Sequence, residues 1–432
     1  MMKKNKYMRS LPVITVALCG LFCLSAAASE KSLTFLSAQL NSSGQQPSDG
    51  FGIAVAIDGD TAVVGATGAQ VNGSPTGAAY VFVRPSTGWV NTTQTATLTA
   101  SDNADQFGAS VAISGDTIVV GAPRTNVGNF AEEGAVYVYV KPSSGWTTMT
   151  ETAKLTGYHV SGIGLDWIGT TVAIDGDTIV AGAPNVFPDY HALGEGEAFV
   201  YAKPKNGWKD TTETAVLYYL IGGIGFAHSI AINGNTIAVG ADGCCYQGET
   251  TTGAGFVFVE PKGGWKTTPH PNAVLTSPGV GANDAFGYAV AVAGNTVVVG
   301  SPQIWDYEVG AAYVYVEPTG GWTNMTQQTA ELYPSFTVEG DFGEFLAMSG
   351  NTVLIGAPFT DIEHGQQGAS YIFTEPKSGW VSTMNYAAML STANGFGYNF
   401  GQSVSISGST IVVGVNGTSS TNGAAFVFWP GQ

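Results

Sequence analysis

Three observations predict an all-β protein: a seven-bladed β-propeller of four-stranded antiparallel blades, closed by the N-terminal strand pairing with the last blade. One segment recurs seven times, each copy carries four strand signals, and the two ends of the chain complete one another. The composition agrees, because 59 glycines, 44% hydrophobic and only 11% charged residues are typical of many short buried strands joined by tight turns.

The repeat is clearest from Phe107 to Pro123, which reads FGASVAISGDTIVVGAP. Related segments begin at Phe51, Ile168, Phe226, Phe286, Phe342 and Phe400. The spacings between consecutive copies are 56, 61, 58, 60, 56 and 58 residues. Seven copies in phase indicate one repeat architecture, although 432 residues would otherwise suggest two or three domains.

Each repeat predicts four strands, which in the second copy are residues 110–113, 117–122, 135–140 and 153–155. The first two are joined by Ser114-Gly115-Asp116 and its equivalents, whose Asn, Asp and Gly residues supply the positive φ of a two-residue hairpin turn. Small residues recur on one face of the first strand, and we expect them to let blades approach near a crowded axis: Ala56, Ala112, Ala173, Ala231, Ala291 and Ala347.

The ends of the chain favour a closed ring over an open solenoid. The seventh repeat stops after its third strand, residues 424–428, and lacks the fourth. Near the other end, Ala38-Gln39-Leu40 matches the fourth-strand sequence Ala96-Thr97-Leu98. An open array would need polar capping repeats, whereas a ring leaves only short, protected edges.

Residues 1–28 are expected to be a signal peptide, and 29–432 the propeller. A basic start precedes the apolar run 11–24, and Ala26-Ala27-Ala28 provides a cleavage site. No later run approaches the ~18 apolar residues of a membrane span. The mature chain is therefore expected to be secreted, periplasmic or at the cell surface, without a membrane span.

After loss of the four basic residues of the signal peptide, 11 basic side chains remain against 32 acidic ones. Such acidity opposes binding to nucleic acid and anionic lipid. We expect a monomer whose partner is an extracellular protein or glycan. Only Cys244 and Cys245 remain in the mature chain, so no disulfide framework is predicted, and a vicinal disulfide or two free thiols both stay open.

Phe107-Gly108 followed by Gly121-Ala122-Pro123 resembles the FG-GAP repeat of integrin α-subunit propellers, and more closely that of bacterial secreted FG-GAP proteins with short first hairpins. Some copies depart from the pattern, with Ile168 in place of Phe and Ala227 in place of Gly. The resemblance covers essentially the whole mature chain. It implies binding or adhesion outside the cell without naming the ligand.

One departure concerns metal binding. Integrin propellers hold calcium in a D-x-D-x-D-G loop between the first two strands, whereas here the connection is a bare turn such as Asp58-Gly59-Asp60. Such a turn is too short to offer the six or more oxygen ligands that calcium takes. We therefore expect no metal site and no cofactor.

The chain contains no G-x-S-x-G, H-E-x-x-H, C-x-x-C or G-x-x-x-x-G-K motif, and we expect a binding protein rather than an enzyme. The residue after each Phe-Gly pair should ring the mouth of the axial channel: Ile53, Ala109, Thr170, His228, Tyr288, Glu344 and Gln402. His228 and Glu344 lie two blades apart, and a water-filled polar channel is the plainer interpretation of this ring.

One Trp per repeat follows the third strand in six copies: Trp89, Trp146, Trp208, Trp265, Trp322 and Trp380. These rings could stack on sugars, as in a lectin with one pocket per blade. Large aromatics at a repeated position are more often part of the core, and we favour that interpretation.

The loops between the second and third strands vary where the rest repeats, and in integrins the corresponding loops form the ligand face. We expect them to share a face with the segments entering each Phe-Gly pair. Their densest aromatic set predicts ligand anchors at Tyr190, His191, Tyr246, Trp305 and Tyr307. The predicted function is a secreted or cell-surface recognition or adhesion module, with a structural envelope protein or a lectin as the alternatives.

Overall fold

The computed structural model describes residues 34–158, 165–186, 196–220, 225–243, 252–281, 284–302, 309–334, 340–361, 367–392, 399–417 and 421–431. Every regular element in these ranges is a β-strand. The same ranges contain no helix that is long and apolar enough to cross a membrane.

The strands form seven antiparallel blades, in each of which the strands follow one another from the centre outwards. Blade 1 comprises β2 (Val55–Asp58), β3 (Thr61–Ala66), β4 (Ala78–Val83) and β6 (Ala96–Leu98). Blade 2 comprises β7 (Ser110–Ser114), β8 (Thr117–Ala122), β9 (Ala135–Val140) and β10 (Ala153–Thr156). Blade 3 comprises β11 (Thr171–Asp175), β12 (Thr178–Ala183), β13 (Glu197–Ala202) and β15 (Ala215–Leu217).

Blade 4 comprises β16 (Phe226–Asn233), β17 (Thr236–Ala241), β18 (Ala254–Val259) and β19 (Ala273–Leu275). Blade 5 comprises β20 (Val290–Ala293), β21 (Thr296–Ser301), β22 (Ala311–Val316) and β23 (Ala330–Leu332). Blade 6 comprises β24 (Phe345–Ser349), β25 (Thr352–Ala357), β26 (Ala369–Thr374) and β27 (Ala388–Leu390). Blade 7 comprises β28 (Ser403–Ser407), β29 (Thr410–Val415), β30 (Ala424–Pro430) and β1 (Phe35–Asn41).

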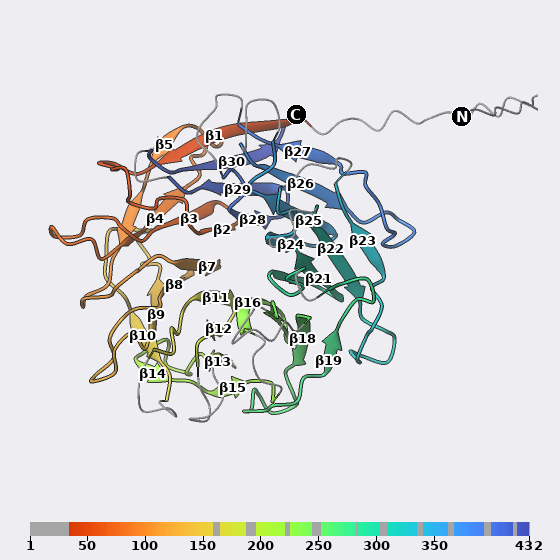
Figure 1. Ribbon diagram of the computed structural model, residues 1–432. Coiled ribbons are helices and arrows are strands. Elements are labelled where there is room, and N and C mark those ends of the chain that lie inside the picture. The colour runs from red at the N-terminus through yellow and green to blue at the C-terminus, as the bar shows by residue number, and fades with distance from the viewer. Residues whose placement is uncertain are drawn as a thin grey trace, which may run out of the picture. The chain divides into compact units, whose positions relative to one another are not determined.

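The blades stand in a ring with their first strands at the centre (Figure 1). The ring closes as the sequence predicts, because β1 supplies the outer strand of blade 7. Ala38 pairs with Val427 and Leu40 with Ala425, in the register that joins Ala96 to Val81 within blade 1. The predicted fold class is therefore confirmed, including its closure.

The first hairpins are two-residue turns, as expected, but only their glycine adopts a left-handed conformation. Gly59 has φ of 55° and Gly115 of 56°, and the residue after each is not left-handed. Glycine at the first central position with positive φ is the pattern of a type II′ turn. The side chain of the Asp, Ser or Asn residue before each glycine is therefore not needed to form the turn. It contacts the neighbouring blade instead.

Two glycines of the repeat, one in the second strand and one in the Phe-Gly pair of the next blade, lie against each other where neighbouring blades touch. A Cβ added to Gly65 of blade 1 would lie 2.1 Å from the carbonyl oxygen of Gly108 in blade 2, a separation that real side chains do not adopt. Gly108 itself has φ of 92°. Blade 4 has Ala227 at this position, with φ of 67°, and the pairing of β16 with β17 shifts register beside it.

The hydrophobic core is divided into seven clusters, each lying between two adjacent blades. In one of them Val63 of blade 1 packs with Phe107 and Ile118 of blade 2. Phe107 also contacts Tyr137, at 5.4 Å between ring centroids. The Phe of each Phe-Gly pair is thus a core residue, and burying such rings drives the blades together.

The six repeated Trp side chains are buried, with 4% to 8% of their surface exposed. They belong to the core, as favoured from the sequence. Each lies in the segment that runs from the third strand of a blade to its outer strand, which we call the strap. Each strap pairs in parallel with the outer strand of the preceding blade; in the strap of blade 1, β5 (Thr92–Thr93) pairs with β1, and in that of blade 3, β14 (Thr211–Thr212) pairs with β10. The Trp therefore anchors a contact between blades.

Candidate functional site

The propeller has two faces that differ in their connections. The hairpin face carries the turns between first and second strands and the start of each strap, and the loop face carries the connections between second and third strands. Gly77 and Gly134, at the end of such connections, form parallel bridges with Phe107 and Ile168 of the next blade. The segments entering each Phe-Gly pair therefore lie on the loop face, which confirms the expectation.

A tight turn in every blade precedes the first strand and positions the residue after the Phe-Gly pair. In blade 2 the N–H of Ala109 donates to the carbonyl of Gln106, at 3.1 Å, and Gln106 has φ of 56°. The residue before the Phe, or before Ile168 in blade 3, has positive φ in all seven blades: Gly50, Gln106, Trp167, Gly225, Ala285, Asp341 and Asn399. Because every blade shares this turn, it belongs to the fold and marks no single blade as a reactive centre.

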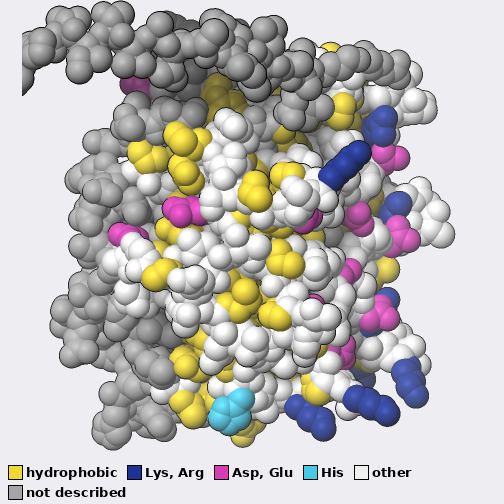
Figure 2. Space-filling view, turned by 90° about the vertical axis from the view of Figure 1, so that its right-hand side faces the viewer, with side chains coloured by type: hydrophobic (Ala, Val, Ile, Leu, Met, Phe, Trp, Pro, Cys, Tyr) yellow, Lys and Arg dark blue, Asp and Glu magenta, His cyan; other side chains and the backbone are white. Residues whose placement is uncertain are grey.

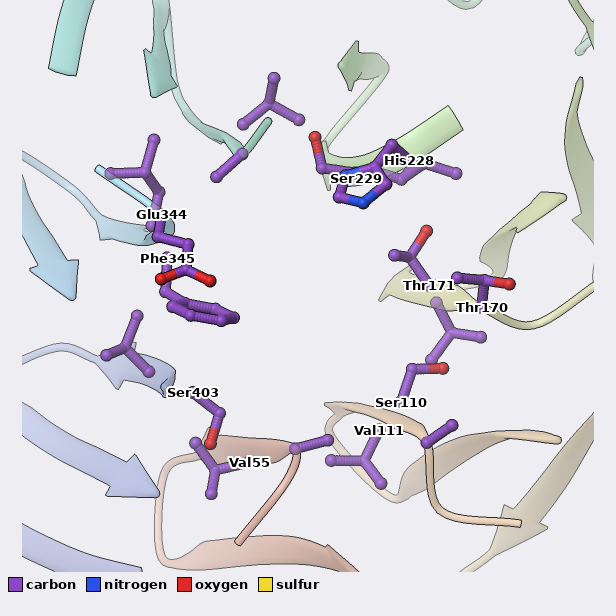
Figure 3. Close-up of a pocket in the computed structure, with 18 of the residues that line it drawn as sticks. Val55, Ser110, Val111, Thr170, Thr171, His228, Ser229, Glu344, Phe345 and Ser403 are labelled. Carbon is purple, nitrogen blue, oxygen red and sulfur yellow. The ribbon is translucent and has the colours of Figure 1, made fainter. Parts of the chain in front are cut away.

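These turns surround a cavity of about 350 Å³ at the loop-face end of the channel (Figure 3). Six of the seven predicted ring residues line it: Ile53, Ala109, Thr170, His228, Tyr288 and Glu344. Gln402 is the exception, since blade 7 contributes Ser403 and Val404 instead. The hairpin-face end of the channel is a second cavity, lined by the predicted row of alanines and by aliphatic neighbours.

The ionisable side chains of the mouth, His228, Tyr288 and Glu344, lie on blades 4 to 6. The rings of His228 and Tyr288 contact each other at 4.6 Å, and His228 Nδ1 lies 3.2 Å from the carbonyl oxygen of Tyr288. Glu344 is the one carboxylate among the described residues that line the cavity. Its Oε2 atom is buried and has no hydrogen-bond partner in the described part of the chain.

Burial raises the pKa of the Glu344 carboxyl to about 8, and the nearby negative charge of Asp341 adds to the shift. A buried carboxyl without a compensating positive charge is more stable in its neutral form. In Figure 3 the Glu344 carboxyl group points into the cavity beside the ring of Phe345. Phe345 was not anticipated as a site residue, although a sequence signal exists, because every other repeat has Ser, Thr or Ala at this position.

Three serine hydroxyl groups at the cavity wall form hydrogen bonds between neighbouring blades. Each donates a hydrogen bond to a glycine carbonyl of the next blade: Ser110 to Gly169, Ser229 to Gly287 and Ser403 to Gly52, at 2.8, 3.2 and 2.8 Å. The hydrogen bonds that these serines donate therefore hold neighbouring blades together.

The five predicted ligand anchors, Tyr190, His191, Tyr246, Trp305 and Tyr307, lie outside the described residues, as do Cys244 and Cys245. One described cluster on the loop face joins blades 2 and 3. Arg124 lies over the ring of Trp167, 4.4 Å from its centroid, and forms an ion pair with Glu132. Trp167 Nε1 also donates to Glu132, at 3.2 Å.

The basic residues are distributed unevenly between the two faces. Of the basic residues that the structure describes, eight lie in strap segments: Arg84, Lys141, Lys203, Lys205, Lys209, Lys262, Lys266 and Lys377. In Figure 2 Lys and Arg side chains gather along one edge of the molecule. The other two described cations, Arg124 and Lys154, are paired with Glu132 and Asp102.

Five segments of the chain, residues 36–82, 92–139, 271–315, 326–373 and 395–428, match the FG-GAP repeat, and together they make up slightly more than half of it. The chain belongs to the FG-GAP repeat family. Blade 3 and the first three strands of blade 4 lie outside the matched segments, and these two blades carry Ile168 and Ala227 at the motif positions. A search of curated proteins found no match.

Proposed function

We propose that this FG-GAP propeller is a secreted or cell-surface recognition or adhesion module, and that it binds an extracellular protein or glycan through the loops of its loop face. The FG-GAP propeller fold is consistent with a ligand-binding or adhesion-type module. The observation that supports the loop face is the position of the cations, because eight of the ten described basic residues lie in the straps, which begin on the opposite face.

The loop face offers carboxylates with few cations to neutralise them. Its described acidic residues that reach solvent are Asp102, Asp105, Glu132, Asp284, Asp341 and Asp361, whereas Asp49, Glu133, Asp166 and Asp242 are buried. Such a surface attracts a cationic partner by long-range steering, and carboxylates also accept hydrogen bonds from sugar hydroxyls. The predicted aromatic anchors would add contact area that loses water on binding.

The extracellular location remains part of the proposal. It depends on removal of residues 1–28, whose sequence has the three parts of a signal peptide. Mass spectrometry of the mature protein recovered from its native host tests this directly. An intact N-terminus with Lys3 and Lys4 still present would contradict secretion through this signal.

A glycan array and a pull-down with the purified mature protein would identify the ligand. Once it is known, Trp305→Ala and Tyr190→Ala should each weaken binding by about 1–3 kcal/mol, as anchor residues usually do, with the melting temperature nearly unchanged. Lys205→Ala, on the opposite side of the molecule, is the matched control and should bind normally. Normal binding by both loop variants would refute the proposed face.

A further inference from the structure

We propose that the cavity at the channel mouth is a binding site for a primary ammonium group, held between the Glu344 carboxylate and the rings of Phe345 and Tyr288. This site is separate from the loop-borne anchors. Its test therefore stands or falls independently of the ligand of the loop face.

The first argument is the state of Glu344. Its Oε2 atom is buried without a partner among the described residues, and the side chain points into the open space of the cavity. An acidic oxygen in this position costs free energy unless a donor or a cation reaches it. The lining residues supply no Lys or Arg, and His228 lies across the cavity, so a cation that stabilises the ionised carboxylate would come from a ligand.

The second argument is the composition of the wall around this carboxyl. Phe345 lies beside it, and Tyr288 lines the same cavity from the neighbouring blade. Aromatic faces attract ammonium groups through their quadrupole, and more strongly where water is excluded. A carboxylate combined with aromatic rings therefore selects an organic cation over a neutral polyol of the same size.

The third argument is access and electrostatics. Thr170, His228, Tyr288 and Glu344 are all partly exposed, so a small molecule can reach them. The chain carries a formal net charge of −17, and Asp341 lies on the same turn as Glu344. This field concentrates cations at the entrance. A cavity of about 350 Å³ accommodates an aliphatic amine or a lysine side chain of a partner.

Binding at this site should be coupled to the release of a proton from Glu344. The groups that face Glu344 are His228 and Tyr288 across the cavity and Asp341 on its own turn. With a pKa of about 8, Glu344 is mostly protonated at pH 7. An arriving ammonium ion stabilises the carboxylate, so the Glu344 proton leaves to the buffer while the amine keeps its own.

The experiment is isothermal titration calorimetry at pH 7 with n-butylammonium chloride, in two buffers of different ionisation enthalpy. An acetylated tripeptide with a central lysine serves as a second probe and distinguishes a free amine from a protein side chain. The mature wild-type protein should bind at least one probe and release most of one proton per bound molecule. The neutral isostere n-butanol should not bind.

Glu344→Gln keeps the shape and removes the charge, and it should weaken binding by at least about tenfold and abolish the proton release. Phe345→Leu should weaken binding and keep the proton release. Asp116→Asn removes an exposed carboxylate of the hairpin face, away from the cavity, and should leave both unchanged. Equal binding by Glu344→Gln, equal binding of n-butanol, or no binding of either probe would each overturn the proposal.

Discussion

The carboxylate of Asp58, at the end of the first strand of blade 1, accepts a hydrogen bond of 2.7 Å from the backbone N–H of Gly115 in blade 2. The same contact recurs around the ring, from Gly176 to Ser114, Gly234 to Asp175, Gly294 to Asn233, Gly408 to Ser349 and Gly59 to Ser407. Blade 5 lacks this contact, because Ala293 has no polar side-chain atom that could accept from the N–H of Gly350 in blade 6. The residue before each turn glycine thus links two blades.

Completing this series of hydrogen bonds between blades should stabilise the protein. Ala293→Asn copies the residue of blade 4 and would accept from the N–H of Gly350, which should add about 0.5–1.5 kcal/mol of stability. Asp58→Ala should cost a similar amount. Thermal unfolding followed by circular dichroism measures both, with Asp116→Ala as control, since its exposed ion pair with Lys141 contributes little. An unchanged melting temperature for Asp58→Ala would show that the contact has no energetic role.

Two residues of the strap of blade 3 should contribute unequally to the free energy of unfolding, the buried Trp208 more than the exposed Asp210. Trp208→Ala removes a buried indole and should cost about 3–5 kcal/mol. Asp210→Ala removes the acceptor for the N–H of Lys154 in the preceding blade, a bond of 2.8 Å, and should cost about 1–2 kcal/mol. Lys209→Ala, between them and exposed, should be neutral. A sugar ligand that is lost in Trp208→Ala without any change in melting temperature would instead favour a lectin site on each blade.

A separate peptide should be able to replace the closing strand β1 after its deletion. Deletion of residues 29–44 removes β1 and leaves the edge of β30 unpaired, so the truncated protein should aggregate. A peptide of residues 34–44 added during refolding should restore the monomer, as light scattering after size-exclusion chromatography would show. A truncated protein that stays monomeric with an unchanged melting temperature would argue against closure by this strand.

The Glu344 carboxyl should make stability depend on pH. Its pKa in the folded state is about 8, above the ordinary value of 4.5, so the folded protein binds the proton more tightly than the unfolded chain does. Stability from this group is fully present below pH 4.5 and is lost as the pH rises towards 8. The difference in melting temperature between Glu344→Gln and wild type should therefore grow across this window. A constant difference would refute the shifted pKa.

The two-residue turns also predict that folding does not require calcium. Asp58 and Asp60 flank a single glycine, and each of the two has another partner, in Gly115 and Arg84. Adding a chelator should leave the melting temperature unchanged. A large decrease would reveal a calcium site elsewhere in the chain.

Much of the fold could be predicted because the sequence repeats. Equivalent positions in seven copies must occupy equivalent places, so the strands, the closing register of Ala38 and Leu40, and the ring position of Glu344 all followed from spacing. The loops between second and third strands do not repeat, so sequence spacing could not place side chains such as Arg124 against Trp167. The anchors predicted in these loops remain a proposal.

Only the tertiary structure decided what each repeated position contacts in the neighbouring blade. Periodicity shows that Asp58 and Ser114 are equivalent, but not that each reaches the turn of the next blade. It shows that Trp208 is part of a pattern, but not that Asp210 holds the preceding outer strand. It places Glu344 at the axis, but the raised pKa depends on how far neighbouring blades exclude water there. Hydrogen bonds and desolvation act across contacts between repeats, and sequence within a repeat carries no record of those distances.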